Sequence, residues 1–257
     1  MSILLPLYVY PQGGAWEPLY SAAKAHPDVD FTVIVNPCSG PCIASLPDKY
    51  YLDEIPKLRT FENIRPLGYV ATSYASKNLS AVTAEINTYA NWPLLTNNTK
   101  MKVDGIFFDE TPSTYSSDKY QYLKTASQLV RNSTKFRDRF VVHNPGNITA
   151  ILAQKDVLQN SYMNLSDITV VFEEAFDKWL DKNTMNALQS DTGVRRSKLA
   201  VILHSIPNIS KKVLDFVVEQ VEETADWLFL TDVKEKDKYY HSFSTMFADL
   251  VDSVDGS

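Results

Sequence analysis

The stretch Val103-Asp-Gly-Ile-Phe-Phe-Asp-Glu-Thr-Pro112 combines a short apolar run with two adjacent carboxylates. Gly105–Phe108 is almost wholly apolar, which is typical of a strand buried on both faces. The run ends abruptly at Asp109 and Glu110, and Pro112 then closes the strand. The two carboxylates are therefore predicted at the carboxyl end of a strand, where α/β proteins build their sites. The alternative is that they only begin a solvated loop or cap the next helix.

The same order of a strand followed by a helix recurs along the chain. Apolar runs that end in Gly, Pro, Asn, Asp or His indicate strands, and these are Ile3–Tyr10, Phe31–Val35, Leu67–Ala71, Gly105–Phe108, Phe140–Val142, Ile168–Phe172, Leu199–Leu203 and Trp227–Leu230. Apolar residues at helical spacing indicate helices at about Trp16–Ala25, Asp48–Arg59, Leu79–Asn91, Asp118–Arg131, Lys178–Gln189, Lys211–Glu222 and Tyr239–Val251. We count eight strand-then-helix units.

This alternation predicts an α/β fold with parallel strands and right-handed crossovers. Eight units in 257 residues fit a single (β/α)8 TIM barrel that occupies residues 1–257 as one domain. The main competitor is an open doubly wound sheet. Neither Gly-x-Gly-x-x-Gly nor Gly-x-x-x-x-Gly-Lys-Ser/Thr occurs, and the chain has only 8 glycines, so a nucleotide-binding sheet is disfavoured.

The composition limits the class of partner. A hydrophobic content of 44% with 12% aromatic residues indicates a globular protein. The net charge of −6 and the lack of a basic block argue against nucleic acid or an anionic membrane, and they leave neutral or cationic ligands open. No apolar run approaches the ~18 residues of a membrane span.

Two sequence features bear on the compartment in opposite ways. Met1–Tyr10 lacks the pattern of a signal peptide, which would make the protein cytoplasmic if Met1 is the native start. Asn-x-Ser/Thr sequons point instead to secretion or the cell surface, and they lie at Asn78, Asn97, Asn132, Asn147, Asn164 and Asn208. Helix capping by these asparagines is the alternative explanation.

Cys38 and Cys42 are the only cysteines of the chain. Two ligands are too few for a structural zinc site, and no nearby His completes one. The spacing also differs from the Cys-x-x-Cys of redox pairs. A small-loop disulfide and two free thiols both remain open.

In a barrel every strand end projects to one face, which we call the mouth. The polar and aromatic residues expected there are Tyr10, Asn36, Tyr69, Asp109, Glu110, His143, Asn144, Glu173, Glu174, His204, Thr231 and Asp232. Alternation along a strand places Asp109 on the face of Gly105 and Phe107 and turns Glu110 away, unless the loop brings it inward. By the same rule Glu173 shares a face with Val171.

Two carboxyl groups that face each other across a polar mouth suit glycoside hydrolysis. Tyr10, Tyr69, Tyr74 and Trp16 could stack on sugar rings, with core packing as the alternative for each. His143 and His204 could instead hold a metal with the carboxylates, but no metal-binding spacing supports this. Gly-x-Ser-x-Gly is absent, which disfavours an esterase.

The strand ends also resemble those of the spherulin 4-like family, which includes fungal glycoside hydrolases of family 135 that act on galactosaminogalactan. The runs that carry the resemblance are in the same order and span nearly the whole chain: Pro6-Leu-Tyr-Val-Tyr-Pro11, Val35-Asn-Pro37, Ser39-Gly-Pro41, Gly68-Tyr-Val-Ala-Thr72, Gly105-Ile-Phe-Phe-Asp-Glu110, Asn144-Pro-Gly146, Val171-Phe-Glu173 and Thr231-Asp232. The chain departs from the family in having cysteines beside Ser-Gly-Pro and in lacking a signal or membrane anchor.

The resemblance implies a (β/α)8 barrel that cleaves α-1,4-linked polysaccharide containing N-acetylgalactosamine. It also implies that Asp109, Glu110 and Glu173 are catalytic. We therefore expect an endo-acting glycosidase in which Asp109 is the nucleophile or stabilising carboxylate, Glu173 is the acid/base and Glu110 is a third candidate. Substrate contacts are expected from Tyr10, Asn36, Tyr69, Asn144, His204 and Asp232.

No cofactor or metal is expected for this chemistry, and the expected partner of the monomer is a polysaccharide, in particular a cationic aminosugar polymer. The second hypothesis is a spore-coat or cell-wall protein that binds polysaccharide on the same barrel without cleaving it. A metal-dependent hydrolase is the third.

Overall fold

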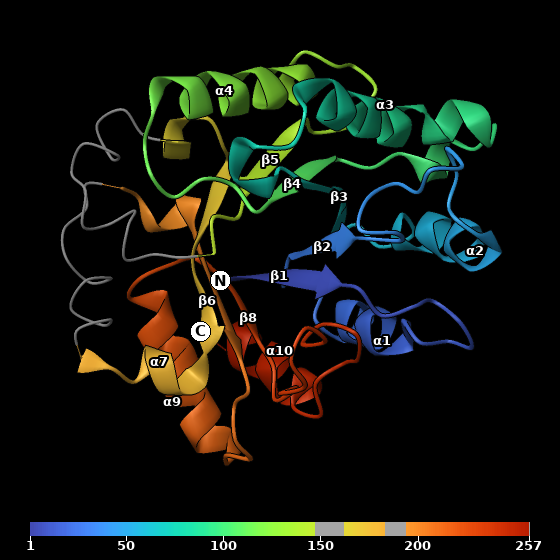
Figure 1. The fold of residues 1–257 in the computed structure, drawn as a ribbon. Coiled ribbons are helices and arrows are strands. Elements are labelled where there is room, and N and C mark those ends of the chain that lie inside the picture. The colour runs from blue at the N-terminus through green and yellow to red at the C-terminus, as the bar shows by residue number, and fades with distance from the viewer. Residues whose placement is uncertain (147–161, 183–193, 257) are drawn as a thin grey trace.

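A computed structural model describes residues 1–146, 162–182 and 194–256 of the chain. Asn147 and most of the helix expected at Lys178–Gln189 lie outside these ranges. Eight parallel strands form a closed barrel in which each strand pairs with the next and β8 pairs with β1 (Figure 1). The prediction of a single (β/α)8 TIM barrel is confirmed. The strands are β1 (Ser2–Leu7), β2 (Phe31–Val35), β3 (Ile64–Ala71), β4 (Gly105–Asp109), β5 (Phe140–His143), β6 (Ile168–Ala175), β7 (Leu199–His204) and β8 (Trp227–Leu230).

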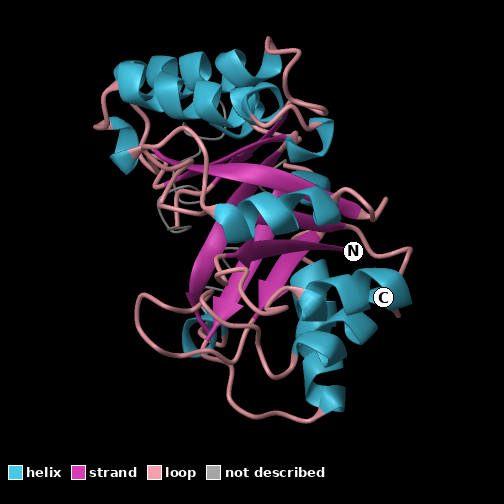
Figure 2. Ribbon diagram, turned by 90° about the vertical axis from the view of Figure 1, so that its right-hand side faces the viewer, coloured by secondary structure: helices cyan, strands magenta, loops and turns pink. Residues whose placement is uncertain are grey.

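Helices cover the outside of the barrel, and Figure 2 shows the strands enclosed between them. The α-helices of the described residues are α1 (Glu17–Ala25), α2 (Lys49–Leu58), α3 (Leu79–Leu95), α4 (Ser117–Arg131), α7 (Phe176–Trp179), α9 (Lys211–Glu222) and α10 (Phe247–Asp255). Short 3-10 turns are η1 (Ser73–Ala75), η2 (Thr99–Met101), η3 (Tyr162–Asn164) and η4 (Arg196–Lys198). No helix among the described residues is both long and apolar enough to cross a bilayer.

Several predicted boundaries are wrong, and two of the errors concern loops of the mouth. The first strand stops at Leu7, whose partner Val35 is also the last residue of β2, so Tyr8 and Tyr10 lie beyond the sheet. The last helix begins at Phe247 and not at Tyr239. The residues before it form turns because Asp232 accepts hydrogen bonds from the side chains of Ser244 and Thr245.

Two glycines allow close approaches that set the positions of the strand ends. A Cβ on Gly105 would lie 1.8 Å from the backbone oxygen of Phe140 in β5. A Cβ on Gly68 would lie 2.7 Å from the ring of Tyr89, which packs over β3 from α3. The Tyr89 hydroxyl donates to the backbone oxygen of Val35 at 3.2 Å and accepts from the backbone nitrogen of Tyr69 at 3.1 Å. The ring therefore joins the ends of β2 and β3 and fixes Tyr69.

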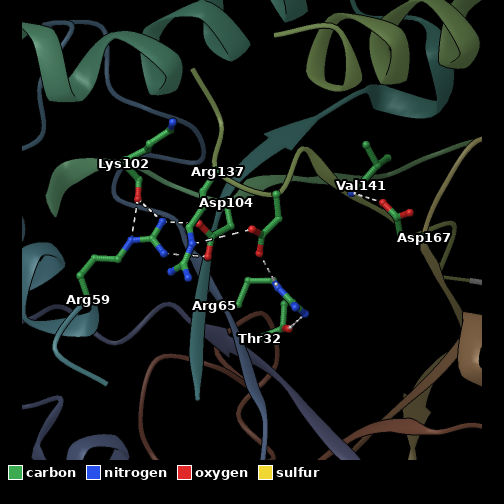
Figure 3. A network of polar contacts seen from close by, with 9 residues as sticks. Thr32, Arg59, Arg65, Lys102, Asp104, Arg137, Val141 and Asp167 are labelled. Carbon is green, nitrogen blue, oxygen red and sulfur yellow. Dashed lines mark hydrogen bonds and ion pairs between the residues drawn. The ribbon is translucent and has the colours of Figure 1, made fainter. Parts of the chain in front are cut away.

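Charged groups gather at the opposite face, where the strands begin (Figure 3). Arg59 donates to Asp104 Oδ2 at 2.9 Å and to the backbone oxygen of Lys102 at 2.9 Å. The side chains of Arg59 and Asp104 are only 9% and 2% exposed, whereas those of Arg65 and Asp138, which pair at 3.2 Å, are 32% and 37% exposed. The ion pairs at this face stabilise the barrel and leave the mouth free for function.

We expect Asp104→Asn to lower the free energy of unfolding by about 3 kcal/mol, because it leaves the buried Arg59 guanidinium without its counter-charge. Asp138→Asn, which removes the exposed partner of Arg65, is the matched control and should cost less than about 1 kcal/mol. Urea unfolding followed by circular dichroism measures both. Equal losses for the two variants would contradict this ranking of the ion pairs.

Candidate active site

Two carboxyl groups and one amide form the centre of the mouth. Asp109 is the last residue of β4, Glu173 lies in β6, and Asn144 follows β5 between them. The Asn144 Nδ2 atom donates to Asp109 Oδ1 at 2.9 Å and to Glu173 Oε2 at 2.6 Å. The carboxyl ends of three neighbouring strands are thus joined through one side chain.

Each carboxyl group has further donors. Asp109 Oδ2 accepts from the Tyr69 hydroxyl at 2.7 Å, and Asp109 Oδ1 accepts from the backbone nitrogen of Glu110 at 2.8 Å. Glu173 Oε1 accepts from the hydroxyl of Tyr240, which is in the loop after β8. Asp109 therefore has three donors and Glu173 has two.

Tyr8 completes the aromatic wall of the centre. Its ring makes edge-to-face contacts with Tyr69, at a centroid distance of 5.8 Å, and with Tyr240, at 5.6 Å. Tyr69 in turn stacks on Phe107 inside the barrel at 6.2 Å. The carboxyl groups are enclosed by three tyrosines from β3 and from the loops after β1 and β8.

Burial and like charge set the ionisation of the centre. Burial raises the pKa of Glu173 above its ordinary 4.5, and the negative charge on Asp109 raises it further. Burial also raises the pKa of Asp109 above 3.8, against the hydrogen bonds from Tyr69 and from the Glu110 backbone, which lower it. Among the described residues Asp109 has more hydrogen-bond donors than Glu173. We therefore infer that Asp109 is the ionised carboxylate of the pair and that Glu173 is the protonated carboxylic acid.

Glu110 adopts a left-handed backbone conformation, with φ of 50°. Its backbone oxygen accepts from Thr72 Oγ1 at 2.8 Å and from the backbone nitrogen of Tyr74 at 2.6 Å. Residues Ser73, Tyr74 and Ala75 are also left-handed. The loops after β3 and β4 are therefore locked together beside the carboxyl groups, and the Glu110 charge raises the pKa of both Asp109 and Tyr69.

Alternation along the strand predicts the direction of Asp109 correctly, but it is not a sound basis for Glu173. A register shift between Val170 and Phe172 makes a bulge at Val171. The face shared by Val171 therefore cannot be extended to Glu173 by counting residues. Hydrogen bonds from Asn144 and Tyr240 fix Glu173 toward the centre instead.

Of the residues expected to contact substrate, Tyr69 and Asn144 touch the carboxyl groups, and four others make their contacts elsewhere. Tyr10 donates to Asp48 Oδ2 at 2.8 Å, and Asn36 Oδ1 accepts from the Gly40 backbone at 2.9 Å. His204 stacks on Tyr239 at 3.8 Å, and Asp232 accepts from Ser244 Oγ at 2.8 Å. Hydrogen bonds from Thr245 and Ser244 lower the pKa of Asp232, although burial opposes them.

The expectation that His143 lies in the mouth is wrong. Its Nε2 atom is 3.0 Å from Ser127 Oγ in α4, so its ring points out of the barrel toward that helix. Burial lowers the His143 pKa to about 3. His143 and His204 therefore cannot share a metal ion, and no group of three or more His, Cys, Asp or Glu side chains in the described residues is placed to hold one.

Sequence reasoning missed Tyr8 and Tyr240. Tyr8 falls within the predicted first strand and Tyr240 within the predicted last helix, so neither was expected at the mouth. The available signal for Tyr8 was its position directly before Val9 and Tyr10 at the end of an apolar run. For Tyr240 the contact with Glu173 spans 67 residues, and no local pattern indicates it.

Comparison with known proteins assigns the chain to a family. The model of spherulation-specific family 4 matches residues 2–254. This chain belongs to that family. Spherulin-4 of Physarum polycephalum is 34% identical over 181 residues, which are 68% of this chain and 45% of that protein, so the match spans less than half of its length.

A solved structure resembles nearly the whole chain. The crystal structure of Aspergillus clavatus Sph3 in complex with GalNAc superposes with a TM-score of 0.91 and 39% sequence identity. The match covers 99% of this chain and 97% of that one. The barrel of this chain therefore has the same fold as that crystal structure over nearly its whole length.

The loop after β2 contains a disulfide bond between Cys38 and Cys42, whose Cα atoms are 5.0 Å apart. The bond closes the loop in which Asn36 accepts from Gly40. Of the two alternatives that the spacing left open, the structure has the bridged one. Five of the sequon asparagines fall in the described residues, and Asn78 is also the N-cap of α3.

We expect the mass of the protein from its native host, measured without reduction, to be two hydrogens below that of the reduced chain, because the Cys38–Cys42 bond removes them. Peptide mapping under the same conditions should place both cysteines in one linked fragment. Two alkylated cysteines in unreduced material would contradict the bond.

Proposed function

We propose that this chain is an endo-acting glycoside hydrolase that cleaves α-1,4-linked polysaccharide containing N-acetylgalactosamine. The observation that carries the proposal is the pair of half-buried carboxyl groups, Asp109 and Glu173, bridged by Asn144 at the mouth of the barrel. The GalNAc bound to Sph3, which is similar over 99% of this chain, supports the class of sugar.

The close approach of the carboxyl groups is the basis on which we propose retention of anomeric configuration. Since both bond to the same nitrogen, the lengths of 2.9 Å and 2.6 Å set an upper limit of 5.5 Å between the two bridged oxygens, Asp109 Oδ1 and Glu173 Oε2, although this limit applies to that pair of oxygens and not to the whole groups. Retaining glycosidases have carboxyl groups about 5–5.5 Å apart, whereas inverting enzymes need about 6.5–9.5 Å to admit water. We therefore propose a double displacement through a glycosyl-enzyme intermediate.

In the first step the Glu173 proton passes to the glycosidic oxygen as its bond to the anomeric carbon breaks, and an Asp109 oxygen bonds to that carbon. Asp109 Oδ2 suits the attack, because Tyr69 is its one donor in the described residues and a lone pair stays free. In the second step Glu173 takes a proton from the water that replaces Asp109. Glu110 remains the third candidate for a catalytic carboxylate.

The charge of the mouth favours a cationic polymer. A partly deacetylated galactosamine chain carries ammonium groups, which Asp109, Glu110 and Glu174 would attract. A neutral glucan gains nothing from this field. Cleavage should therefore weaken as salt rises and should be slight on cellulose, starch or chitin.

We expect Asp109→Asn and Glu173→Gln each to reduce cleavage of the galactosamine polymer at least ~10²-fold, because the amides keep shape but lose the nucleophile or the proton. Glu174→Gln is the matched control. Because Glu174 is exposed, this substitution should reduce cleavage only slightly. Mass spectrometry of the products measures cleavage, and circular dichroism verifies the fold. Wild-type rates in both core variants would place the site elsewhere.

The activity of the unaltered chain on the galactosamine polymer, cellulose, starch and chitin separates the competing functions. Oligomers released from the galactosamine polymer, unaffected by a chelator, support a carboxylate hydrolase. Binding of the polymer without any product would favour the non-catalytic reading. Loss of activity with chelator, restored by a divalent ion, would favour a metal-dependent hydrolase.

The pH dependence of kcat/KM should be bell-shaped, because Asp109 must be ionised and Glu173 protonated. Activity falls as pH drops through the Asp109 pKa and again as pH rises through the Glu173 pKa; both are raised. Tyr240→Phe removes a hydrogen bond that lowers the Glu173 pKa. We therefore expect this variant to move the alkaline limb to higher pH.

The neighbouring Tyr239→Phe serves as the control for this profile, because Tyr239 stacks on His204 and not on the carboxyl groups. Its alkaline limb should coincide with that of the unaltered chain. A limb that stays in place in Tyr240→Phe, or one that moves to lower pH, would show that Glu173 is not the acid.

A further inference from the structure

The exposed tyrosines of the described residues all lie near the loops that follow the first four strands of the barrel. Four tyrosine side chains are more than a third exposed: Tyr10 at 44%, Tyr50 at 39%, Tyr74 at 58% and Tyr115 at 38%. They lie in or directly after the loops that follow β1, β2, β3 and β4. These loops open at the same face as the carboxyl groups, so the rim of the mouth is aromatic on that side.

Tyr10 and Tyr50 are held together as a pair, which we call the aromatic shelf. Their ring centroids are 5.6 Å apart, at an interplanar angle of 65°. The Tyr10 hydroxyl donates to Asp48 Oδ2 at 2.8 Å, and Asp48 Oδ1 caps α2 by accepting from the Tyr50 backbone at 2.9 Å. Gln12 donates to the Tyr50 hydroxyl at 3.4 Å. One carboxylate thus orders both rings.

Two buried aromatic residues support the shelf from below. Tyr51 and Trp16 are 3% and 1% exposed, and their rings are 6.0 Å apart. Tyr10 packs edge-on against Tyr51 at 5.7 Å. Trp16 is fixed by a hydrogen bond from Nε1 to the backbone oxygen of Val9 at 2.8 Å. Tyr51 and Trp16 fill the core below the shelf, so Tyr10 and Tyr50 are not needed for core packing. Their exposed surfaces are held in place and are available to bind a ligand.

The shelf begins two residues along the chain from one of the tyrosines that enclose the carboxyl groups. Tyr8, which contacts Tyr69 and Tyr240 in the centre, is two residues before Tyr10. Two residues of extended chain span at most about 7 Å between Cα atoms. A polymer bound at the carboxyl groups would therefore reach the shelf with a nearby sugar unit.

We propose that Tyr10 and Tyr50 form a sugar-binding subsite that holds a pyranose unit of the polymer outside the point of cleavage. This rests on the proposed function and specifies where the chain binds. In a galacto-configured ring the C–H bonds at C3, C4 and C5 form an apolar patch opposite the axial O4, and that patch buries apolar surface against a tyrosine ring. The Gln12 amide and the Asp48 carboxylate lie at the shelf's edge, where sugar hydroxyls or an ammonium group would bond.

The test is binding, measured in the full chain carrying Glu173→Gln so that the ligand is not consumed. Isothermal titration calorimetry compares an α-1,4-linked N-acetylgalactosamine hexamer with free N-acetylgalactosamine. Tyr50→Leu and Tyr10→Leu remove the aromatic faces, and each should weaken hexamer binding roughly tenfold while leaving the monosaccharide unchanged. Tyr50→Phe keeps the ring and should restore most of the affinity.

Phe216→Leu is the matched control, because Phe216 is 58% exposed on α9, away from the mouth loops. It should bind the hexamer as the parent does. Hexamer affinities that stay at the parent value in both Tyr10→Leu and Tyr50→Leu, or a parent that does not bind the hexamer, would overturn the shelf. Cleavage by the unaltered chain is scored separately, so a chain that binds through the shelf but releases no product overturns only the proposed hydrolysis.

Discussion

The bridge from one amide to two half-buried carboxyl groups is the interaction on which the mouth depends. Asn144 donates from a single nitrogen to Asp109 and Glu173, which would otherwise repel each other in a site of low dielectric. The bridge works only if β4, β5 and β6 end at the same level, as the closed parallel barrel ensures. The remaining oxygens are then satisfied by tyrosines from distant parts of the chain, Tyr69 and Tyr240.

The barrel separates the groups that support its fold from those that could perform chemistry. At the face where strands begin, acids are matched with arginines, as in the nearly buried pair of Arg59 and Asp104. At the mouth, Asp109 and Glu173 have neutral donors and no cation within the described residues. Neutral donors leave both carboxyl groups able to gain or lose a proton, whereas a paired arginine would hold a carboxylate permanently ionised.

The sequence predicts the barrel and most of the centre, because both follow from local patterns. The bounds of β2, α9 and β8 agree with the apolar runs, and alternation from Gly105 through Phe107 directs Asp109 inward. Glu173 does face the centre as expected, but a bulge in β6 means that alternation alone does not explain its direction. The expectation for His143, which rested on its place at a strand end, is wrong because its polar side chain turns outward to Ser127. Tyr8 and Tyr240 were missed, since their roles arise from contacts between segments that only the closed barrel brings together.

The ionisation of the centre also has a thermodynamic consequence for the fold. A carboxyl group whose pKa is higher in the folded chain than in the unfolded chain binds its proton more tightly when folded. Its contribution to stability is therefore complete below the unfolded pKa and is lost as pH rises through the folded one. Asp109 and Glu173 are both of this kind, so at neutral pH they oppose folding. The apolar strands and the ion pairs at the opposite face offset this opposition, which is how a site that is unfavourable in itself persists in a stable barrel.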